Sequence, residues 1–432
     1  MADIRPFAGI QYDLSSVGCD LSKLVTQPYD KISPDLQKEY YARSEHNIIR
    51  IEKNQSEVEG NPYITAKSYL DKWLADGTLK PAKTPAFYYL EQTFSFGDET
   101  FTRKAIIGMG RLHDYKDGIV FPHEQTLKGP KADRLELIRA TAINLGQIFM
   151  LYEDPKHLVQ TAIDAAIKGK TPWARFVDDE GITQTIYVIT DLVATTAIHA
   201  LMADKQLFIA DGHHRYETAL GYSLEIAKKT GNTDPNAPFR FAMMSMVNAY
   251  DEGLLVLPTH RLINHKTSFP LEPLLSVLKR DFEIEKIVLP SDLEKMHGVI
   301  KNLPAHSVSL FHKDDLAHLY QLTLTSKPYN ASLPESLTTL DVYMLHEVIL
   351  AKQLGITSDD LANHTYITYK RDPAGTCKAV IEGKEQMAFL LKPTDVEDVI
   401  RVARDRQTMP QKSTDFFPKF LTGYVIADVA TA

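Results

Sequence analysis

The chain has 432 residues, of which 44% are hydrophobic and 24% are charged, and its formal net charge at pH 7 is −8. This length exceeds what one hydrophobic core usually organises, so more than one domain is expected. The negative net charge excludes binding of nucleic acid through a broad, positively charged surface. It does not exclude a small cluster of basic residues at one site.

The chain begins without an apolar signal core in Met1 to Phe7, and no apolar run approaches the roughly 20 residues that a membrane helix needs. The expected location is the cytoplasm, with neither a membrane nor a nucleic acid as partner. Only two cysteines occur, Cys19 and Cys377, so neither a disulfide framework nor a thiolate zinc site is expected. The expected partner is a small-molecule substrate, and the oligomeric state is left open.

The first region, residues 1–155, has the pattern of an α+β structure. Ser33-Pro34-Asp35 predicts a helix start with Pro34 at the first helical position, and a second helix is expected from 64 to 74. Aromatic and β-branched residues predict a strand over 86–94, with residues 101–111 as its hairpin partner.

The second region, residues 156–265, alternates strand and helix patterns: a strand over 186–191, a helix through Ala203, a strand over 207–210 and another helix. This order predicts an α/β unit whose ligand site lies at the carboxyl end of a strand. The apolar run 241–248 is expected to be a central strand, with its methionines in the core.

The third region, residues 266–432, predicts a separate α/β module. Its elements are a helix over 270–279, a strand over 282–288, and a hairpin of 308–312 with 319–324. The whole chain is therefore expected to have a mixed α/β fold.

Residues with functional side chains are most concentrated in the turn after the strand 207–210. This turn carries Asp211, Gly212, His213, His214 and Arg215. The first N–H groups of the helix that follows are free to meet an anion, and the helix dipole favours one. Gly212 allows close approach of the backbone, and Arg215 offers a planar fork suited to phosphate. A second interpretation makes Asp211 and one histidine metal ligands.

A second group of polar residues pairs His123 and Glu124, which can do acid–base work, with the cations Lys128, Lys131 and Arg134. If this segment meets the turn at Asp211, the site gains a candidate base and further phosphate clamps. A third group, residues 408–419, is an aromatic, basic and hydroxyl-rich loop that serves either as a packed connection or as a lid.

Several motifs, in this order along nearly the whole chain, resemble the bacterial and archaeal family known as domain of unknown function 1015. They are Pro28-Tyr29-Asp30, His46 to Arg50, Pro122-His123-Glu124, Gly129 to Leu135, Ala210 to Ala219, Leu257 to Arg261 and Met409 to Thr414. The family name implies no activity.

The turn Asp211 to Arg215 also resembles the Gly-x-x-Arg turn of the ParB and sulfiredoxin superfamily. That resemblance implies a nucleotide-binding core in which the phosphates rest on the turn. The superfamily includes free-serine kinases, so it also implies a nucleotide, ATP or ADP, with Mg²⁺ as cofactors, and a small substrate such as an amino acid.

The leading hypothesis is a nucleotide-dependent phosphotransferase of the free-serine-kinase kind. Residues 212–215 would bind the phosphates, Asp211 would hold Mg²⁺ or the substrate hydroxyl, Glu124 would be the base, and Lys131 and Arg134 would clamp charge.

Two alternatives stay open. One is a metal-dependent phosphate-ester hydrolase with four ligands around one ion, His123, Glu124, Asp211 and His213. The other is a switch of the ParB kind, which binds nucleotide without turning it over.

Overall fold

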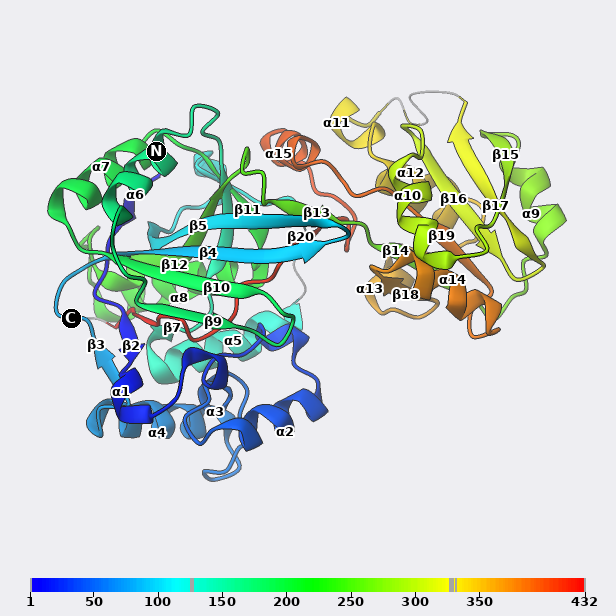
Figure 1. Cartoon of the computed structure of the whole chain (residues 1–432). Helices are drawn as coiled ribbons and strands as arrows, with labels where there is room; N and C mark the ends of the chain where they lie inside the picture. The colour runs from blue at the N-terminus through cyan, green and yellow to red at the C-terminus, as the bar shows by residue number, and fades with distance from the viewer. Residues whose placement is uncertain (1, 125–127, 326–329, 331, 431–432) are drawn as a thin grey trace. The chain divides into compact units, whose positions relative to one another are not determined.

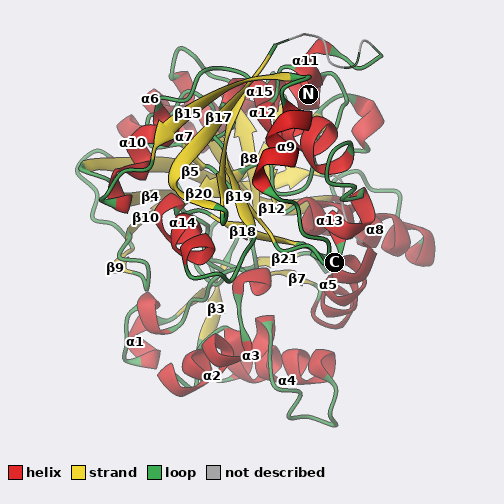
Figure 2. Cartoon of the chain, turned by 90° about the vertical axis from the view of Figure 1, so that its right-hand side faces the viewer, coloured by secondary structure: helices red, strands yellow, loops and turns green. Residues whose placement is uncertain are grey.

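The computed structural model describes residues 2–124, 128–325, 330 and 332–430, which divide into two compact units. The first unit holds the described residues within 1–122, 126–255 and 418–432, and the second holds those within 123–125 and 256–417. Figure 2 distinguishes helices from strands, and both units contain both, which confirms the mixed α/β fold. The sequence analysis divides the chain into three regions, 1–155, 156–265 and 266–432. That division stays a prediction.

The first unit is built on a nine-stranded mixed sheet, whose strands β4 and β5 are the long central arrows of Figure 1. β8 runs parallel to β12 and β6 parallel to β11, whereas the other neighbours are antiparallel. The order is β6 (Val120–Phe121), β11 (Leu207–Asp211), β8 (Ile148–Tyr152), β12 (Phe241–Asn248), β5 (Glu99–Arg111), β4 (Phe87–Phe96), β10 (Thr183–Ile189) and β9 (Ala174–Val177), with β1 (Ile4–Arg5) on β5. The predicted hairpin and the predicted central strand are confirmed.

Smaller elements complete the first unit. Its α-helices are α1 (Leu14–Val17), α2 (Pro34–Arg43), α3 (Ile49–Glu52), α4 (Pro62–Ala75), α5 (Lys128–Thr141), α6 (Leu158–Ile167), α7 (Leu192–Met202) and α8 (His213–Thr230). The short 3-10 helices are η1 (Leu21–Lys23), η2 (Tyr29–Lys31), η3 (Tyr115–Asp117) and η4 (Pro238–Arg240). Two strand pairs are β2 (Ile10–Tyr12) with β3 (Leu79–Pro81) and β7 (Ile143–Asn144) with β21 (Ala427–Asp428).

Local sequence signals explain where these helices begin and end. Ser33 caps α2 by accepting a hydrogen bond from the N–H of Leu36, and Pro34 takes the first helical position, as predicted. α8 ends at Gly231, whose positive φ of 68° suits a glycine. The side chains on the inner face of each helix determine how that helix packs on the sheet.

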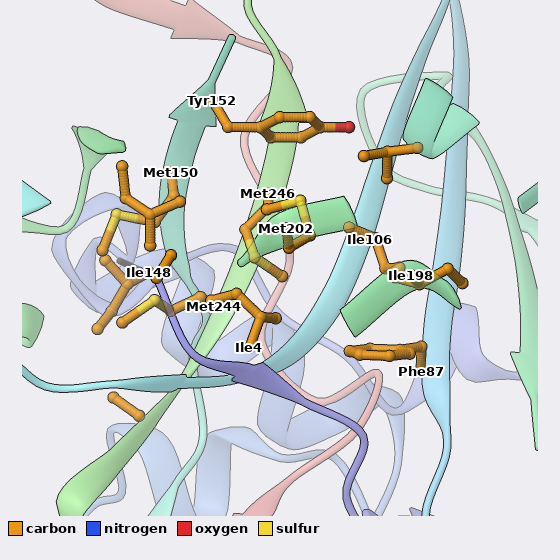
Figure 3. Packing of buried hydrophobic residues seen from close by; sticks show 14 of the residues in the cluster. Ile4, Phe87, Ile106, Ile148, Met150, Tyr152, Ile198, Met202, Met244 and Met246 are labelled. Atoms are coloured by element: carbon orange, nitrogen blue, oxygen red, sulfur yellow. The ribbon is translucent and has the colours of Figure 1, made fainter. Parts of the chain in front are cut away.

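The core of the first unit is rich in methionine and isoleucine. Met244 and Met246 of β12 lie among the side chains of Ile4, Phe87 and Met202, and each is at most 1% exposed (Figure 3). Burial of such a side chain contributes roughly 1.5–3 kcal/mol. The expectation that these methionines fill the core is confirmed.

The second unit contains a six-stranded antiparallel sheet in the order β15 (Phe282–Val288), β17 (Asp315–Leu324), β16 (Ser307–His312), β19 (Met387–Leu390), β14 (His260–Ile263) and β18 (Ile367–Lys370). The predicted hairpin of β16 and β17 is confirmed. Its helices are α9 (Leu271–Leu278), η5 (Leu293–Lys295), α10 (Met296–Lys301), α11 (Glu335–Thr338), α12 (Asp341–Met344), the π-helix η6 (Leu345–Ala351), α13 (Ser358–Ala362), α14 (Pro373–Ile381) and α15 (Val396–Arg404). Short strands β13 (Leu255–Leu257) and β20 (Asp415–Phe417) lie at the ends of this stretch.

In the described part of the chain, no helix is both long and apolar enough to cross a membrane.

Two glycines of the first unit provide a matched test of the packing. A Cβ at Gly253 would lie 2.3 Å from the backbone carbonyl oxygen of Thr102, which cannot move aside, whereas a Cβ at Gly221 on α8 would meet nothing within 4 Å. We expect Gly253→Ala to lower the free energy of unfolding by about 1–3 kcal/mol. Gly221→Ala should raise it by about 0.5–1 kcal/mol, because alanine favours helix. Urea unfolding followed by circular dichroism measures both, and equal effects would contradict this packing.

Candidate functional site

The turn between β11 and α8 is shaped by Gly212. Its φ is 91°, a left-handed conformation that favours glycine, and no side-chain hydrogen bond caps the α8 start within the described residues. A Cβ at Gly212 would lie 3.0 Å from Cζ of Arg215, because the guanidinium folds back over the turn. The turn therefore places a helix start that has no side-chain cap from Gly212 beside a cation, an arrangement at which helix N-termini commonly bind anions.

Asp211 is the centre of the charges at this turn. Its Oδ2 accepts a hydrogen bond of 2.8 Å from Nη2 of Arg215, and its Oδ1 lies 3.5 Å from Nζ of Lys419. Burial acts to raise the pKa of Asp211, but Lys419, Arg215 and other positive groups outweigh it and hold this pKa well below its usual range. Asp211 is therefore a carboxylate at any pH near neutral.

Arg215 is already engaged on both terminal nitrogens. Besides its bond to Asp211, it donates from Nη1 to the backbone carbonyl of Gln147. The guanidinium thus links α8 to β11 and to the segment before β8, and its position is fixed.

The two histidines of the turn differ in burial. His213 is buried and His214 is half-buried. Burial lowers the pKa of His214, and nearby Lys131 and Arg215 act in the same direction, whereas Glu217 and Asp30 oppose them. His214 is therefore mostly neutral at pH 7.

Two predicted cations, Lys131 and Arg134, reach α8 from α5, which packs beside it. Nζ of Lys131 lies 2.7 Å from Oε2 of Glu217, and Arg134 lies over the ring of Tyr29 at 4.4 Å from its centroid. The first unit thus gathers Lys131, Arg134 and the turn, whereas the side chain of Lys128 lies outside the described residues.

Glu52, at the end of α3, is a polar residue of this region that the sequence analysis did not single out. Its side chain is 5% exposed, and its Oε1 lies 3.4 Å from Nη1 of Arg134. Burial raises the pKa of Glu52, although Arg134 and Arg215 act in the opposite direction. No local pattern distinguishes it, because its role depends on α3 meeting α5 and α8.

His123 and Glu124 belong to the second unit, where they contact the loop around residue 412. Nε2 of His123 lies 3.0 Å from the hydroxyl oxygen of Thr414, and the N–H of Met409 donates to the His123 carbonyl. Oε1 of Glu124 accepts from the N–H of Lys412 at 3.3 Å. Two segments that the sequence analysis treated separately therefore lie side by side.

Arg261, at β14, holds the same loop from inside the second unit. It is 1% exposed and donates from Nη2 to the carbonyl of Lys412 at 3.0 Å. Two neutral histidines accompany it, because burial lowers the pKa of His260 to about 3 and takes that of His346 well below its usual range. The loop is thus anchored by a buried cation.

The four-ligand metal hypothesis has no support in these side chains. Across the described ranges, no three histidine, cysteine, aspartate or glutamate side chains form a group that could hold a metal ion. His123 and Glu124 belong to the second unit, whereas Asp211 and His213 belong to the first.

Fold and site together define a mixed α/β protein with a charged glycine turn between a strand and a helix. The chain belongs to the family described as "Protein of unknown function (DUF1015)", whose model matches residues 4–343. That match confirms the family resemblance, while the ParB-like relation stays a prediction. No curated protein matches the chain.

Solved structures give more distant likenesses. A conserved hypothetical protein from Pyrococcus furiosus is 13% identical with a TM-score of 0.34, covering 75% of this chain and 95% of its own. A free serine kinase in complex with AMP has 13% identity and a TM-score of 0.34, with 75% and 91% covered. SbnI from Staphylococcus aureus, truncated at its C-terminus, has 10% identity and a TM-score of 0.34, with 74% and 86% covered.

The neutral His260 predicts acid sensitivity of the second unit. Below about pH 6.5 the unfolded chain binds a proton on this imidazole and the folded chain does not, so stability falls as the pH decreases toward about 4. We expect His260→Asn to reduce the slope of unfolding free energy against pH by up to about 1.4 kcal/mol per pH unit. Urea unfolding at several pH values measures it, with the exposed His364→Asn as control. Identical slopes in all three proteins would contradict the prediction.

Proposed function

We propose that the chain is a nucleotide-dependent phosphotransferase acting on a small molecule, with the phosphates bound at the start of α8. The observation that carries this proposal is the glycine turn at the start of α8, where Gly212 provides no side-chain cap and Arg215 folds over the turn. A helix N-terminus of this kind binds phosphate through its N–H groups and its dipole. The residues of the phosphate site would be Gly212, His213, His214 and Arg215, with Lys131 and Arg134 supplying further positive charge from α5.

Asp211 is the residue that would hold Mg²⁺ or the substrate hydroxyl. It is ionised, but its two oxygens already face Arg215 and Lys419. Mg²⁺ is commonly held by one or two carboxylates together with phosphate oxygens of the substrate. We therefore propose that Mg²⁺ arrives with the nucleotide, since these side chains do not form a metal centre alone.

Acid–base groups for the transfer are available in each unit. The sequence analysis predicts this role for Glu124 and His123, which contact the loop around Lys412 in the second unit. Glu52 is a buried carboxyl group of the first unit near Arg134 and Arg215. Phosphoryl transfer depends mainly on positioning and charge neutralisation, so the phosphate site is the part to test first.

Calorimetry with ADP and with ATP, each with Mg²⁺, tests the proposal. We expect the full chain to bind a nucleotide and Arg215→Ala to weaken binding about 10- to 100-fold, because the guanidinium fixes the turn through its bonds to Asp211 and Gln147 and adds positive charge beside the phosphates. Arg215→Lys, which keeps the charge beside Asp211, should be weaker than the native chain but stronger than the alanine variant. Turnover is measured as nucleotide hydrolysis or as phosphorylation of serine.

Arg139→Ala is the matched control. Arg139 also lies on α5 and pairs with Glu225 of α8, about 15 Å along that helix from Arg215. Its loss should leave nucleotide affinity unchanged.

Absence of any nucleotide binding would overturn the proposal. Binding without turnover, with a nucleotide-dependent change of assembly state, would favour the switch, and a stoichiometric transition metal in the purified protein would favour the hydrolase.

A further inference from the structure

A cavity of about 60 Å³ lies in the first unit, directly behind Arg215. It is bounded by α5, α8, the end of α3 and the segment from β7 to β8. At roughly 10–15 Å³ for each water-sized group, it has room for only a few non-hydrogen atoms. The lining residues are Glu52, Arg134, Leu137, Ile138, Ile143, Asn144, Leu145, Gly146, Ile148, Arg215, Thr218 and Ala219.

The cavity wall includes an unsatisfied hydroxyl group. Oγ1 of Thr218, in a residue only 6% exposed, has no hydrogen-bond partner within the described part of the chain. The same holds for both side-chain atoms of Gln147, the residue whose carbonyl binds Arg215. Buried polar atoms are normally paired, so an unpaired hydroxyl in a cavity wall indicates a missing partner.

The cavity wall also carries opposite charges. The carboxyl of Glu52 and the guanidinium groups of Arg134 and Arg215 all line the cavity, and Glu52 pairs with Arg134 at 3.4 Å. Other lining side chains are aliphatic, such as Leu137, Ile143 and Ile148. A molecule that fits must therefore be small and carry both polar groups and carbon.

We propose that this cavity binds the phosphoryl acceptor, a small aliphatic hydroxy acid, and that Glu52 takes the proton of its hydroxyl group. The inference rests on the phosphotransferase function proposed above and names its acceptor site. The acceptor carboxylate faces Arg134 and Arg215, its hydroxyl faces Glu52 and Thr218, and its carbon atoms face the aliphatic wall. Arg215 then belongs both to the phosphate site and to the acceptor site, which brings the two reactants together.

The transfer step balances with a nucleoside triphosphate or diphosphate as co-reactant. The acceptor O–H bond breaks and its proton moves to the Glu52 carboxylate, while the oxygen forms a bond to the terminal phosphorus. The bond from that phosphorus to its bridging oxygen breaks, and the shortened nucleotide leaves with the electron pair. The products are a phosphomonoester, the nucleotide with one phosphate fewer, and a proton that Glu52 returns to solvent.

The surroundings of Glu52 suit a base. Burial raises the pKa of its carboxyl, which makes the carboxylate a better proton acceptor near neutral pH. The charged and titratable groups that face it are Arg134 and Asp133 of α5, Arg215 of α8, and Tyr29 and Asp30 of η2. Deprotonated Glu52 is the active form, so the transfer rate should rise with pH through the pKa of Glu52.

Binding to the cavity is tested without nucleotide, by calorimetry with glycolate and L-lactate, and with glycerol as the probe that lacks a carboxylate. The full chain should bind the two acids more tightly than glycerol. Ala219→Leu fills the cavity and should abolish binding, whereas Ala227→Leu, two turns further along α8, should not. Thr218→Val keeps the side-chain shape and should weaken binding about fivefold or more. No binding of either acid, or equal effects of the two leucine variants, would overturn the acceptor site.

Transfer is tested by ³¹P NMR with ATP, Mg²⁺ and the same two acids. Glu52→Gln keeps the size of the side chain and should still bind nucleotide, yet form phosphomonoester at least about 100-fold more slowly and without the rise with pH. Native-like transfer by Glu52→Gln would overturn the role of Glu52. If both acids bind in the cavity but no nucleotide binds, the proposed phosphotransferase function fails while the cavity remains a hydroxy-acid site.

Discussion

The ion pairs of Asp211 are the constraint on which the first unit depends. The carboxylate ends β11, Arg215 belongs to the first turn of α8, and Lys419 comes from the last segment of the chain. A partly buried carboxylate needs compensation by opposite charge, and here two cations from distant segments supply it. The turn, the helix start and the end of the chain are therefore held at one point.

The segment after Pro418 packs against side chains of the nine-stranded sheet. The carbonyl of Lys419 accepts a hydrogen bond from Gln92, and Phe420 packs edge-on against Phe149. The guanidinium of Arg103 lies over both rings, 4.8 Å from the centroid of Phe149 and 4.3 Å from that of Phe420. Burial lowers the pKa of Arg103 to about 9, and the two rings offset part of the cost of burying its charge.

Local patterns predicted several of the longer elements of this fold and two of its hairpins, but not the other strand partners. The strands 86–94 and 101–111, the helix starting at Pro34 and the central strand 241–248 follow from local pattern, and each is present. The pairing of β11 with β8, however, joins segments nearly sixty residues apart, and no local signal carries it. Local rules specify elements, whereas long-range packing specifies their order in the sheet.

The residues of the candidate site also fall into those that one segment of the sequence predicts and those that depend on long-range packing. The turn from Asp211 to Arg215 was predictable because glycine, acid and arginine occur within five residues. Glu52 was not, because its burial and its pairing with Arg134 depend on how α3 meets α5. The contact between His123 and Thr414 likewise joins segments 291 residues apart. Functional side chains that lie in one segment can be predicted from the sequence, whereas those brought together from several segments cannot.

Arg215 illustrates why the backbone matters more than side-chain charge at the α8 start. Its two terminal nitrogens already serve Asp211 and the carbonyl of Gln147, so an incoming phosphate does not meet an unused fork. The helix N–H groups beyond Gly212 carry no side-chain cap within the described residues, and they supply directed donors at no rearrangement cost. Gly212 is then essential for two separate reasons, since any side chain there would strain its backbone and displace the guanidinium. The arginine fixes the shape of the turn, and the turn, through its backbone, is the part suited to hold the anion.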